Sequence, residues 1–388
     1  MTIDSAKERA KAAVEAARDE LTEISLEIHK HPELAMKEER ASKLLADRLE
    51  AREWAVERGA FDIPTAFRAT WGQGPITIAY LLEYDALPDI GHACGHNLIA
   101  TAGLGGAYGA QAALDPTQVK VVVLGTPAEE DIGGKAMMIE RGAFDGVDVA
   151  LMVHPAPLEI ADPPMFGVES AVVKYHGRGA HASMAPETAL NALDAIVIAY
   201  QGLAQLRQHI RRDSRTSGVI LEGGEASNVI PHYTMGRFEV RAQRPEYLEE
   251  LKKRAEGCFR AGAEATGCTV EIDWGHFKYA PMNNNKPLAM AYKANAESLG
   301  RKFLPIPPES TGSSDMGNVS WVVPGIHPTF QIGQFALNHT AGFTDAAATD
   351  AAHENMVEVA QALAMTGVDV AMDAGLLEEA KRAFAASR

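Results

Sequence analysis

The chain has 388 residues, of which 46% are apolar, and carries a formal net charge of −16. This length exceeds what one compact core usually accommodates, so two domains are expected. The acidic balance, without a lysine- or arginine-rich cluster, argues against nucleic acid or an anionic membrane as a partner. Three cysteines form an odd, sparse set, which favours reduced thiols. With no signal-peptide core and no run of about 18 apolar residues, the sequence predicts a cytoplasmic location.

The first part of the chain alternates helical and strand-like patterns. Charged and apolar residues at helical spacing predict one amphipathic helix over about 4–30 and a second over about 38–52. Four strand-like runs follow, and an Ala/Gly-rich helical segment lies between the second and the third. The runs are Thr65–Thr70, Ile76–Leu82, Val119–Leu124 and Val147–Val153, and the helical segment is Asn97–Leu114. This order predicts an α/β fold with a largely parallel sheet and helices on both faces.

The character of the chain changes near residue 168. Strands alternate there with two long helices, expected at about 187–210 and 245–266, which predicts a smaller α+β sandwich. After about residue 282 the αβ character returns. The later elements are helices at about 287–298, 345–365 and 376–386 and a Gly/Ser loop at 311–317. The predicted organisation is one domain of residues 1–167 and 281–388, interrupted by a second domain of residues 168–280.

Residues of metal-ligand type follow the predicted strands, at the sheet edge where active sites gather in such folds. They are Cys94, His96, Glu130, His154 and His339. Each has a structural alternative, such as a buried thiol in a packed loop, a solvated acidic pair or a loop histidine. Thiolate and imidazole are ligands that zinc prefers. Five ligands exceed the needs of one catalytic zinc, whereas two metals about 3.5–4 Å apart would use them all.

Glu129 stands next to Glu130, and two adjacent carboxylates at a strand end can divide their roles. One can ligate a metal while the other stays free as a general base. Three functions fit this set. We expect a two-metal amidohydrolase. The alternatives are a catalytically silent metal-binding relative that acts as a binding or regulatory protein, and a cysteine hydrolase with Cys94 as its nucleophile.

Nine short motifs, ordered along nearly the whole chain, carry a family resemblance. They are HPEL (31–34), EYDALPDIGHACGHN (83–97), GTPAEE (125–130), HPAP (154–157), GRGAHAS (177–183), ALNALDAIV (189–197), EASNVIP (225–231), GSSDMGN (312–318) and NHT (338–340). On these motifs the chain resembles the aminoacylase-type family of dinuclear metallopeptidases and amidohydrolases. It looks closest to the branch with auxin-conjugate hydrolases, aminobenzoyl-glutamate hydrolase and the β-alanyl dipeptidases.

The resemblance implies two divalent metal ions, with Zn²⁺ expected because of the thiolate and Mn²⁺ next. Their implied ligands are Cys94, His96, Glu130, His154 and His339, with Cys94 in the bridging position. A metal-activated water would attack the amide bond of a small N-acyl amino acid or dipeptide-like substrate with a free carboxylate. Glu129 would be the general base, and His181 would stabilise the oxyanion. The inserted domain is implied to be a lid that also forms a homodimer interface.

The chain departs from many relatives at Glu83–Asp85, where they place a His-x-Asp pair. We therefore expect Asp85 to orient a ligand imidazole rather than bind a metal. Asn97 stands where the auxin-conjugate relatives often have Asp. In the inserted domain, Asn228 could bind a substrate carbonyl or carboxylate, or could cap a turn. Arg241 is the expected partner of the substrate carboxylate, because arginine pairs with carboxylates through two hydrogen bonds.

Overall fold

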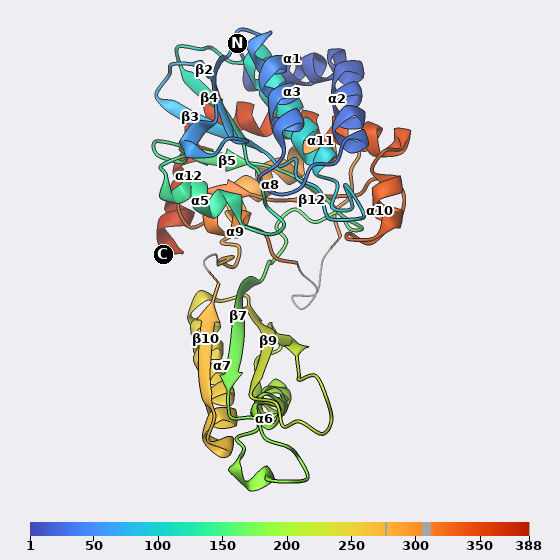
Figure 1. The fold of residues 1–388 in the computed structure, drawn as a ribbon. Helices are drawn as coiled ribbons and strands as arrows, with labels where there is room; N and C mark the ends of the chain where they lie inside the picture. The colour runs from blue at the N-terminus through green and yellow to red at the C-terminus, as the bar shows by residue number, and fades with distance from the viewer. Residues whose placement is uncertain (276–277, 305–311, 388) are drawn as a thin grey trace. The chain divides into compact units, whose positions relative to one another are not determined.

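The computed structural model describes residues 1–275, 278–304 and 312–387, and these form two compact units (Figure 1). The first unit contains residues 1–163, 283–304 and 318–387 of the described chain, and the second contains the remainder. Thr311, where the expected Gly/Ser loop begins, lies outside the described residues, and residues 312–317 belong to the second unit. The two units are described separately below.

The sheet of the first unit has six strands in the order β1-β2-β4-β3-β5-β11. Their bounds are β1 (Ala55–Arg58), β2 (Phe67–Gly72), β3 (Ile76–Leu82), β4 (Val119–Gly125), β5 (Val149–Leu151) and β11 (Gly325–Ile326). β3, β4, β5 and β11 are parallel, so the predicted largely parallel α/β fold is confirmed. β2 instead runs antiparallel to β4, because only three residues join β2 to β3 and a parallel crossover needs a much longer connection.

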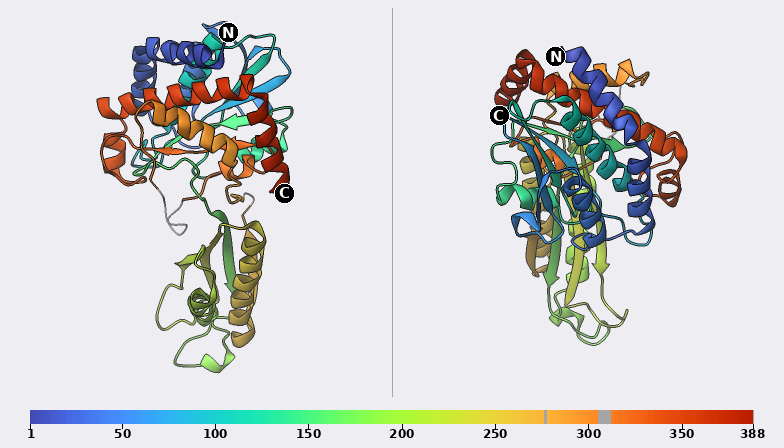
Figure 2. Two further views of the ribbon diagram at one scale, coloured as in Figure 1. Left: turned by 180° about the vertical axis from the view of Figure 1, so that it is seen from behind. Right: turned by 90° about the horizontal axis from the view of Figure 1, so that it is seen from above.

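Helices lie on both sides of this sheet (Figures 1 and 2). They are α1 (Ile3–Ala16), α2 (Arg18–Lys30), α3 (Glu39–Glu50), α4 (His96–Ala113), α5 (Gly134–Glu140), α8 (Lys286–Ser298), α9 (Met316–Val319, at the boundary of the units), α10 (Ala341–Ala346), α11 (Asp350–Met372) and α12 (Ala374–Ala386). The prediction of one helix over 4–30 is wrong. The helix breaks at Ala17 (φ −95°, ψ 4°), where no Pro or Gly marks the sequence, and α1 and α2 each pack on α4. Within the described ranges, no helix has the length and apolar composition needed to cross a bilayer.

The Ala/Gly-rich helix α4 lies at the centre of the first unit and is buried along almost its whole length. Its glycines allow close packing. A Cβ at Gly109 would lie 2.5 Å from the Cβ of Ala364 on α11, and one at Gly106 would lie 2.8 Å from the ring of Tyr80 on β3. The glycine pattern of this helix therefore serves helix packing. The helix begins at His96, near the carboxyl end of β3, which positions its first turn at the functional edge of the sheet.

The second unit is an antiparallel four-stranded sheet in the order β10-β7-β9-β8, packed against two helices. The elements are β7 (Gly167–His176), α6 (Ala192–Leu206), β8 (Ser214–Glu222), β9 (Tyr233–Ala242), α7 (Pro245–Thr266) and β10 (Thr269–Trp274). β7 and β9 alternate buried and more exposed residues, as expected for a sheet covered on one face. α6 starts later than expected because the Asn191 side chain caps it by accepting the Leu193 N–H.

Candidate metal centre

The loop after β3 brings Cys94 and His96 to the carboxyl edge of the sheet. Gly95 between them caps α4 in the left-handed conformation (φ +79°). A Cβ on Gly95 would lie 2.6 Å from Cγ of Pro155, so a larger residue would collide with the segment that follows β5. Glycine therefore lets the Cys94 loop press against the His154–Pro155 segment, called β6, which brings three candidate ligands together.

The Asp85 carboxylate orients the fully buried His96 ring. Asp85 Oδ1 lies 2.9 Å from His96 Nδ1, and Asp85 Oδ2 accepts the backbone N–H of Glu130 at 3.0 Å. This arrangement directs His96 Nε2 away from Asp85, and this atom has no hydrogen-bond partner within the described chain. Burial alone would lower the pKa of His96, but the charge and hydrogen bond of Asp85 raise it well above the usual range in the metal-free protein.

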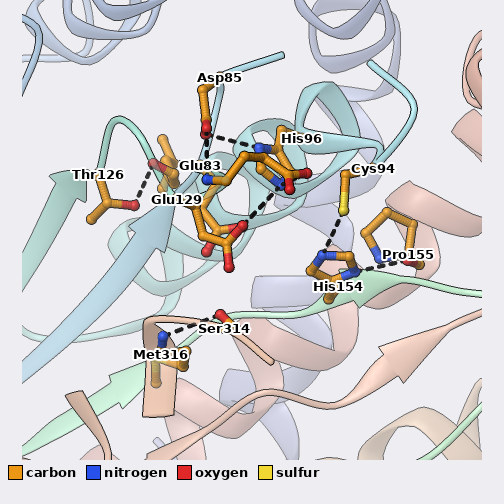
Figure 3. A network of polar contacts seen from close by, with 12 residues as sticks. Glu83, Asp85, Cys94, His96, Thr126, Glu129, His154, Pro155, Ser314 and Met316 are labelled. Carbon is orange, nitrogen blue, oxygen red and sulfur yellow. Dashed lines mark hydrogen bonds and ion pairs between the residues drawn. The ribbon is translucent and has the colours of Figure 1, made fainter. Parts of the chain in front are cut away.

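His154 also presents its Nε2 atom to Cys94. Its Nδ1 lies 2.8 Å from the carbonyl oxygen of Pro155, and since a carbonyl can only accept, Nδ1 carries the proton. Nε2 therefore has a free lone pair, and it lies 3.4 Å from Sγ of Cys94 (Figure 3). Burial lowers the pKa of His154, which keeps the ring neutral and suited to bind a metal.

Glu130 and His339 form the other side of the centre. Oε2 of Glu130 lies 3.4 Å from Nε2 of His339, and although burial opposes ionisation, His339 and His96 lower the pKa of Glu130 to about 2. His339 has a positive φ of 64°, uncommon for a residue with a side chain, and its N–H donates to the Ala93 carbonyl. This bond ties the His339 loop to the loop of Cys94.

The ligand-type atoms fall into groups whose members all lie within 4.8 Å of one another. One group is Cys94, His96 and His154, and another is Cys94, Glu130 and His339. All five predicted ligands are thus brought together, and the sulfur belongs to both groups. The buried atoms His96 Nε2 and Glu130 Oε1 lack hydrogen-bond partners among the described residues, which would be costly unless a cation satisfied them. The residues present therefore fit a two-ion centre.

Glu129 lies beside this centre without belonging to either of those two groups. Its side chain is almost completely buried, and Oε2 lies 3.9 Å from Nε2 of His96 (Figure 3). The preceding residue, Ala128, has a positive φ of 60°, and its N–H donates to Oε1 of the buried Glu38 at 2.9 Å. This contact supports a strained turn that aims Glu129 toward the candidate ligands.

Three buried residues near the ligands were given no role in the sequence interpretation. Glu83 pairs with Lys135, and both side chains are inaccessible to solvent. The ring of His327 lies 5.2 Å from that of His154, and neither of its ring nitrogens has a hydrogen-bond partner in the described chain. Glu83 and His327 directly follow strands β3 and β11, so the strand-end signal could have identified both. Lys135, in the first turn of α5, gives no such signal.

Asn97 has a packing role in the first unit. Its side-chain amide donates to Oγ of Ser25 at 2.9 Å and to the carbonyl oxygen of Ala347 at 3.1 Å. An aspartate could donate neither bond, which gives a structural reason for asparagine at this position.

The remaining predicted residues, His181, Asn228 and Arg241, belong to the second unit. His181 and Asn228 are exposed and lie on paired loops, since the Ala182 N–H donates to the Asn228 carbonyl at 3.0 Å. A hollow of about 480 Å³ adjoins these loops. Arg241 on β9 is separate from them. It donates to Glu239 Oε2 at 2.9 Å and to Ser313 Oγ at 3.2 Å.

The chain matches the family model for Peptidase family M20/M25/M40 over residues 82–368. It belongs to this family. The resemblance inferred from the sequence motifs is therefore confirmed, and so is the predicted class of enzyme, a metal-dependent hydrolase of amide bonds.

Curated relatives of this M20-family chain cover nearly its full length. It is 44% identical over 400 residues to Xaa-Arg dipeptidase from Mus musculus, covering 98% of this chain and 93% of the relative. It is 29% identical to a p-aminobenzoyl-glutamate hydrolase polypeptide from Escherichia coli, covering 95% of this chain and 93% of the relative.

Among solved structures, a putative aminohydrolase from methicillin-resistant Staphylococcus aureus has a TM-score of 0.80 at 21% identity and covers 94% of this chain and 99% of its own. A Bacillus subtilis protein described as a dinuclear metal binding peptidase from the M20 family has a TM-score of 0.73 at 20% identity, covering 92% and 99%. Because these sequence identities are low, the two solved structures show only that this chain has the same fold.

Proposed function

We propose that the protein hydrolyses the amide bond of dipeptide-like or N-acyl amino acid substrates at a two-ion centre with Cys94 as the shared ligand. The observation that carries this proposal is that Cys94 belongs to both ligand groups, while the buried Glu129 lies next to them. His96 and His154 would complete one ion site, and Glu130 and His339 the other. The thiolate favours zinc, and manganese is the second choice.

When bound, the ions would polarise the substrate carbonyl and lower the pKa of the attacking water. The residues of the chain supply the remaining steps. Oε2 of Glu129 takes a proton from the attacking water and later delivers it to the leaving amine. In the second unit, the Ser183 N–H donates to Nδ1 of His181, so the neutral ring carries its proton on Nε2. That N–H would donate a hydrogen bond to the oxyanion of the tetrahedral intermediate.

The names of the relatives support a substrate with a free carboxylate, because Xaa-Arg dipeptides and p-aminobenzoyl-glutamate both end in one. Arg241 is the proposed partner of this group, and Asn228 the proposed contact to a carbonyl or carboxylate. We assign the metal-binding role to residues 1–167 and 281–388 and the role of a lid to residues 168–280. A cytoplasmic location completes the proposal, since it suits a centre that depends on a reduced thiol.

A homodimer formed through the lid is also proposed. β8 is an edge strand of the lid sheet, and α6 packs against it. Apolar side chains point outward from both elements: Val197 and Ile198 on α6, and Val219 and Leu221 on β8. An unpaired strand edge next to exposed apolar residues is a surface that proteins usually cover, and a second copy of the chain would cover it.

The neighbouring carboxylates Glu129 and Glu130 provide a matched test of the proposed function. Glu129→Gln should keep both ions, measured by elemental analysis after gel filtration, and lose about 10²–10⁴-fold in kcat on a dipeptide or N-acyl amino acid. Glu130→Gln should lose metal as well as turnover. If Glu129→Gln stays within about tenfold of the wild type, the role of Glu129 as general base is wrong.

A further inference from the structure

Glu83 is a buried carboxylate in which, among the described residues, one oxygen has a hydrogen-bond partner and the other has none. It directly follows β3, and its side chain is fully inaccessible to solvent. Oε1 pairs with Nζ of Lys135 at 2.5 Å, while Oε2 has no hydrogen-bond partner among the described residues. A buried carboxylate oxygen without a partner is costly, so this atom calls for an explanation beyond the ion pair with Lys135.

The unpaired oxygen faces a candidate ligand. Oε2 of Glu83 lies 3.5 Å from Nε2 of His96, the ring nitrogen that Asp85 leaves available for a metal. Ligand-type atoms of Glu83, His96 and Glu129 all lie within 4.8 Å of one another, which makes a third group beside the two that contain Cys94. In Figure 3, Glu83 and Glu129 lie beside His96, each from its own segment.

We propose that Glu83 is a sixth protein ligand of the two-ion centre and binds the ion held by His96 through Oε2. This inference rests on the proposed function above and extends its ligand set. The role of Lys135 follows from it. The buried Lys135 ammonium binds Oε1 and so orients the carboxylate with Oε2 toward His96. It also neutralises the negative charge that Glu83 brings into the protein interior.

The charges around His96 suit a centre with two divalent cations. Four carboxylates lie within 4 Å of its ring nitrogens, and they belong to Glu83, Asp85, Glu129 and Glu130. Burial raises the pKa of the free Cys94 thiol, so its thiolate would form when a cation binds. With that thiolate the five groups would carry five negative charges, and the Lys135 ammonium compensates the charge of Glu83. The remaining four equal the charge of two divalent cations. A buried centre is most stable when its charges are paired in this way.

The simpler hypothesis is that Glu83 only neutralises Lys135. Charge-matched variants distinguish this counter-ion role from the proposed ligand role. Glu83→Gln keeps the size of the side chain, and combining it with Lys135→Met removes both members of the pair. If Glu83 is only a counter-ion, the double variant should recover the metal affinity lost in Glu83→Gln. If Glu83 is a ligand, the double variant should stay as weak as the single one.

The experiment titrates metal-free protein with Co²⁺ against a competing chelator and records the visible absorption of the loaded protein. We expect one of the two dissociation constants to rise by more than about 100-fold in Glu83→Gln, beyond the cost of losing a residue that only orients a ligand. The Co²⁺ spectrum should also change, because one coordination position loses its charged ligand. The control is Asp148→Asn. Asp148 pairs with Lys381 and accepts the Thr77 N–H at the opposite end of β3, so both constants should stay unchanged.

Recovery of affinity in the double variant, or wild-type constants and spectrum in a folded Glu83→Gln protein, would overturn the inference. Circular dichroism of the metal-free variants shows whether they fold, and the double variant covers the case in which loss of the Glu83 charge beside Lys135 prevents folding. Whether Glu83 proves to be a ligand or not, the Glu129→Gln experiment still tests the proposed hydrolytic function separately.

Discussion

Oδ1 of Asp85 lies 2.9 Å from Nδ1 of His96, and this contact determines which nitrogen of the ring can bind a metal. An ionised carboxylate can only accept, so Nδ1 carries the proton in the metal-loaded state and the lone pair of Nε2 is free. Since Asp85 also accepts the Glu130 N–H, a single carboxylate orients ligands from two loops.

We therefore predict that Asp85→Asn weakens metal binding although Asp85 is not itself a ligand. An asparagine amide that donates to Nδ1 would place the ring proton on Nε2, the atom that must bind the ion. We expect a loss of about 10–100-fold in affinity for one of the ions, measured by chelator competition. Unchanged affinity would mean that the ring orients without this contact.

The sequence predicted the candidate centre better than it predicted the details of the fold. The strand-end rule placed Cys94, Glu130 and His154 at one edge because parallel strands end together, and the structure brings these side chains into contact distance. The sequence did not predict the helix break at Ala17, because no Pro or Gly marks that position. The break instead accompanies the packing of both α1 and α2 on α4.

The sequence also could not predict the burial of polar side chains whose partners lie far away in the chain. Lys135 lies in the first turn of α5, where a lysine is usually solvated, and its pairing with the distant Glu83 helps to make complete burial possible. His327 is similar, because it is buried and its ring lies tilted against that of His154, far from it in the chain. The function of such residues becomes visible only when the fold brings their partners together.

The proposed substrate contact of Arg241 predicts opposite effects from two neighbouring residues on β9. Glu239 occupies the guanidinium in the absence of substrate, so it competes with a substrate carboxylate. Arg241→Met should raise KM by about 10–100-fold with little change in kcat, as expected for loss of a charge-assisted pair. Glu239→Gln should lower KM. A KM that does not move in Arg241→Met would assign the carboxylate to another residue.

The exposed apolar residues on α6 and β8 predict that the protein forms a dimer through the second unit. Val219 lies on the edge strand β8 and is 51% exposed, so a lysine there should charge an apolar interface without disturbing the core. We expect wild type to be a dimer and Val219→Lys a monomer by light scattering. Met290→Lys is the control, because Met290 is a comparable exposed residue on α8 of the first unit. Equal masses for wild type and Val219→Lys would place the interface elsewhere.

The buried carboxyl of Glu38 predicts a pH dependence of stability. Burial, with a smaller contribution from the charge of Asp85, raises the pKa of Glu38 from 4.5 to about 7. Between these values the folded protein retains a proton that the unfolded chain has released. The free energy of unfolding should therefore fall as pH rises from about 4.5 to 7, by at most about 3 kcal/mol, and level off above that range.

Glu38→Gln isolates this contribution, because a glutamine oxygen can still accept the N–H groups of Met36 and Ala128 but does not titrate. Urea unfolding of the metal-free proteins at pH 5 and pH 8 gives the difference in unfolding free energy between variant and wild type. This difference should shift in favour of the variant by about 2–3 kcal/mol between the two pH values, since all other titrating groups cancel in the comparison. A shift below about 0.5 kcal/mol would mean that Glu38 ionises at its ordinary pKa, and that a charged carboxylate supports the turn at Ala128.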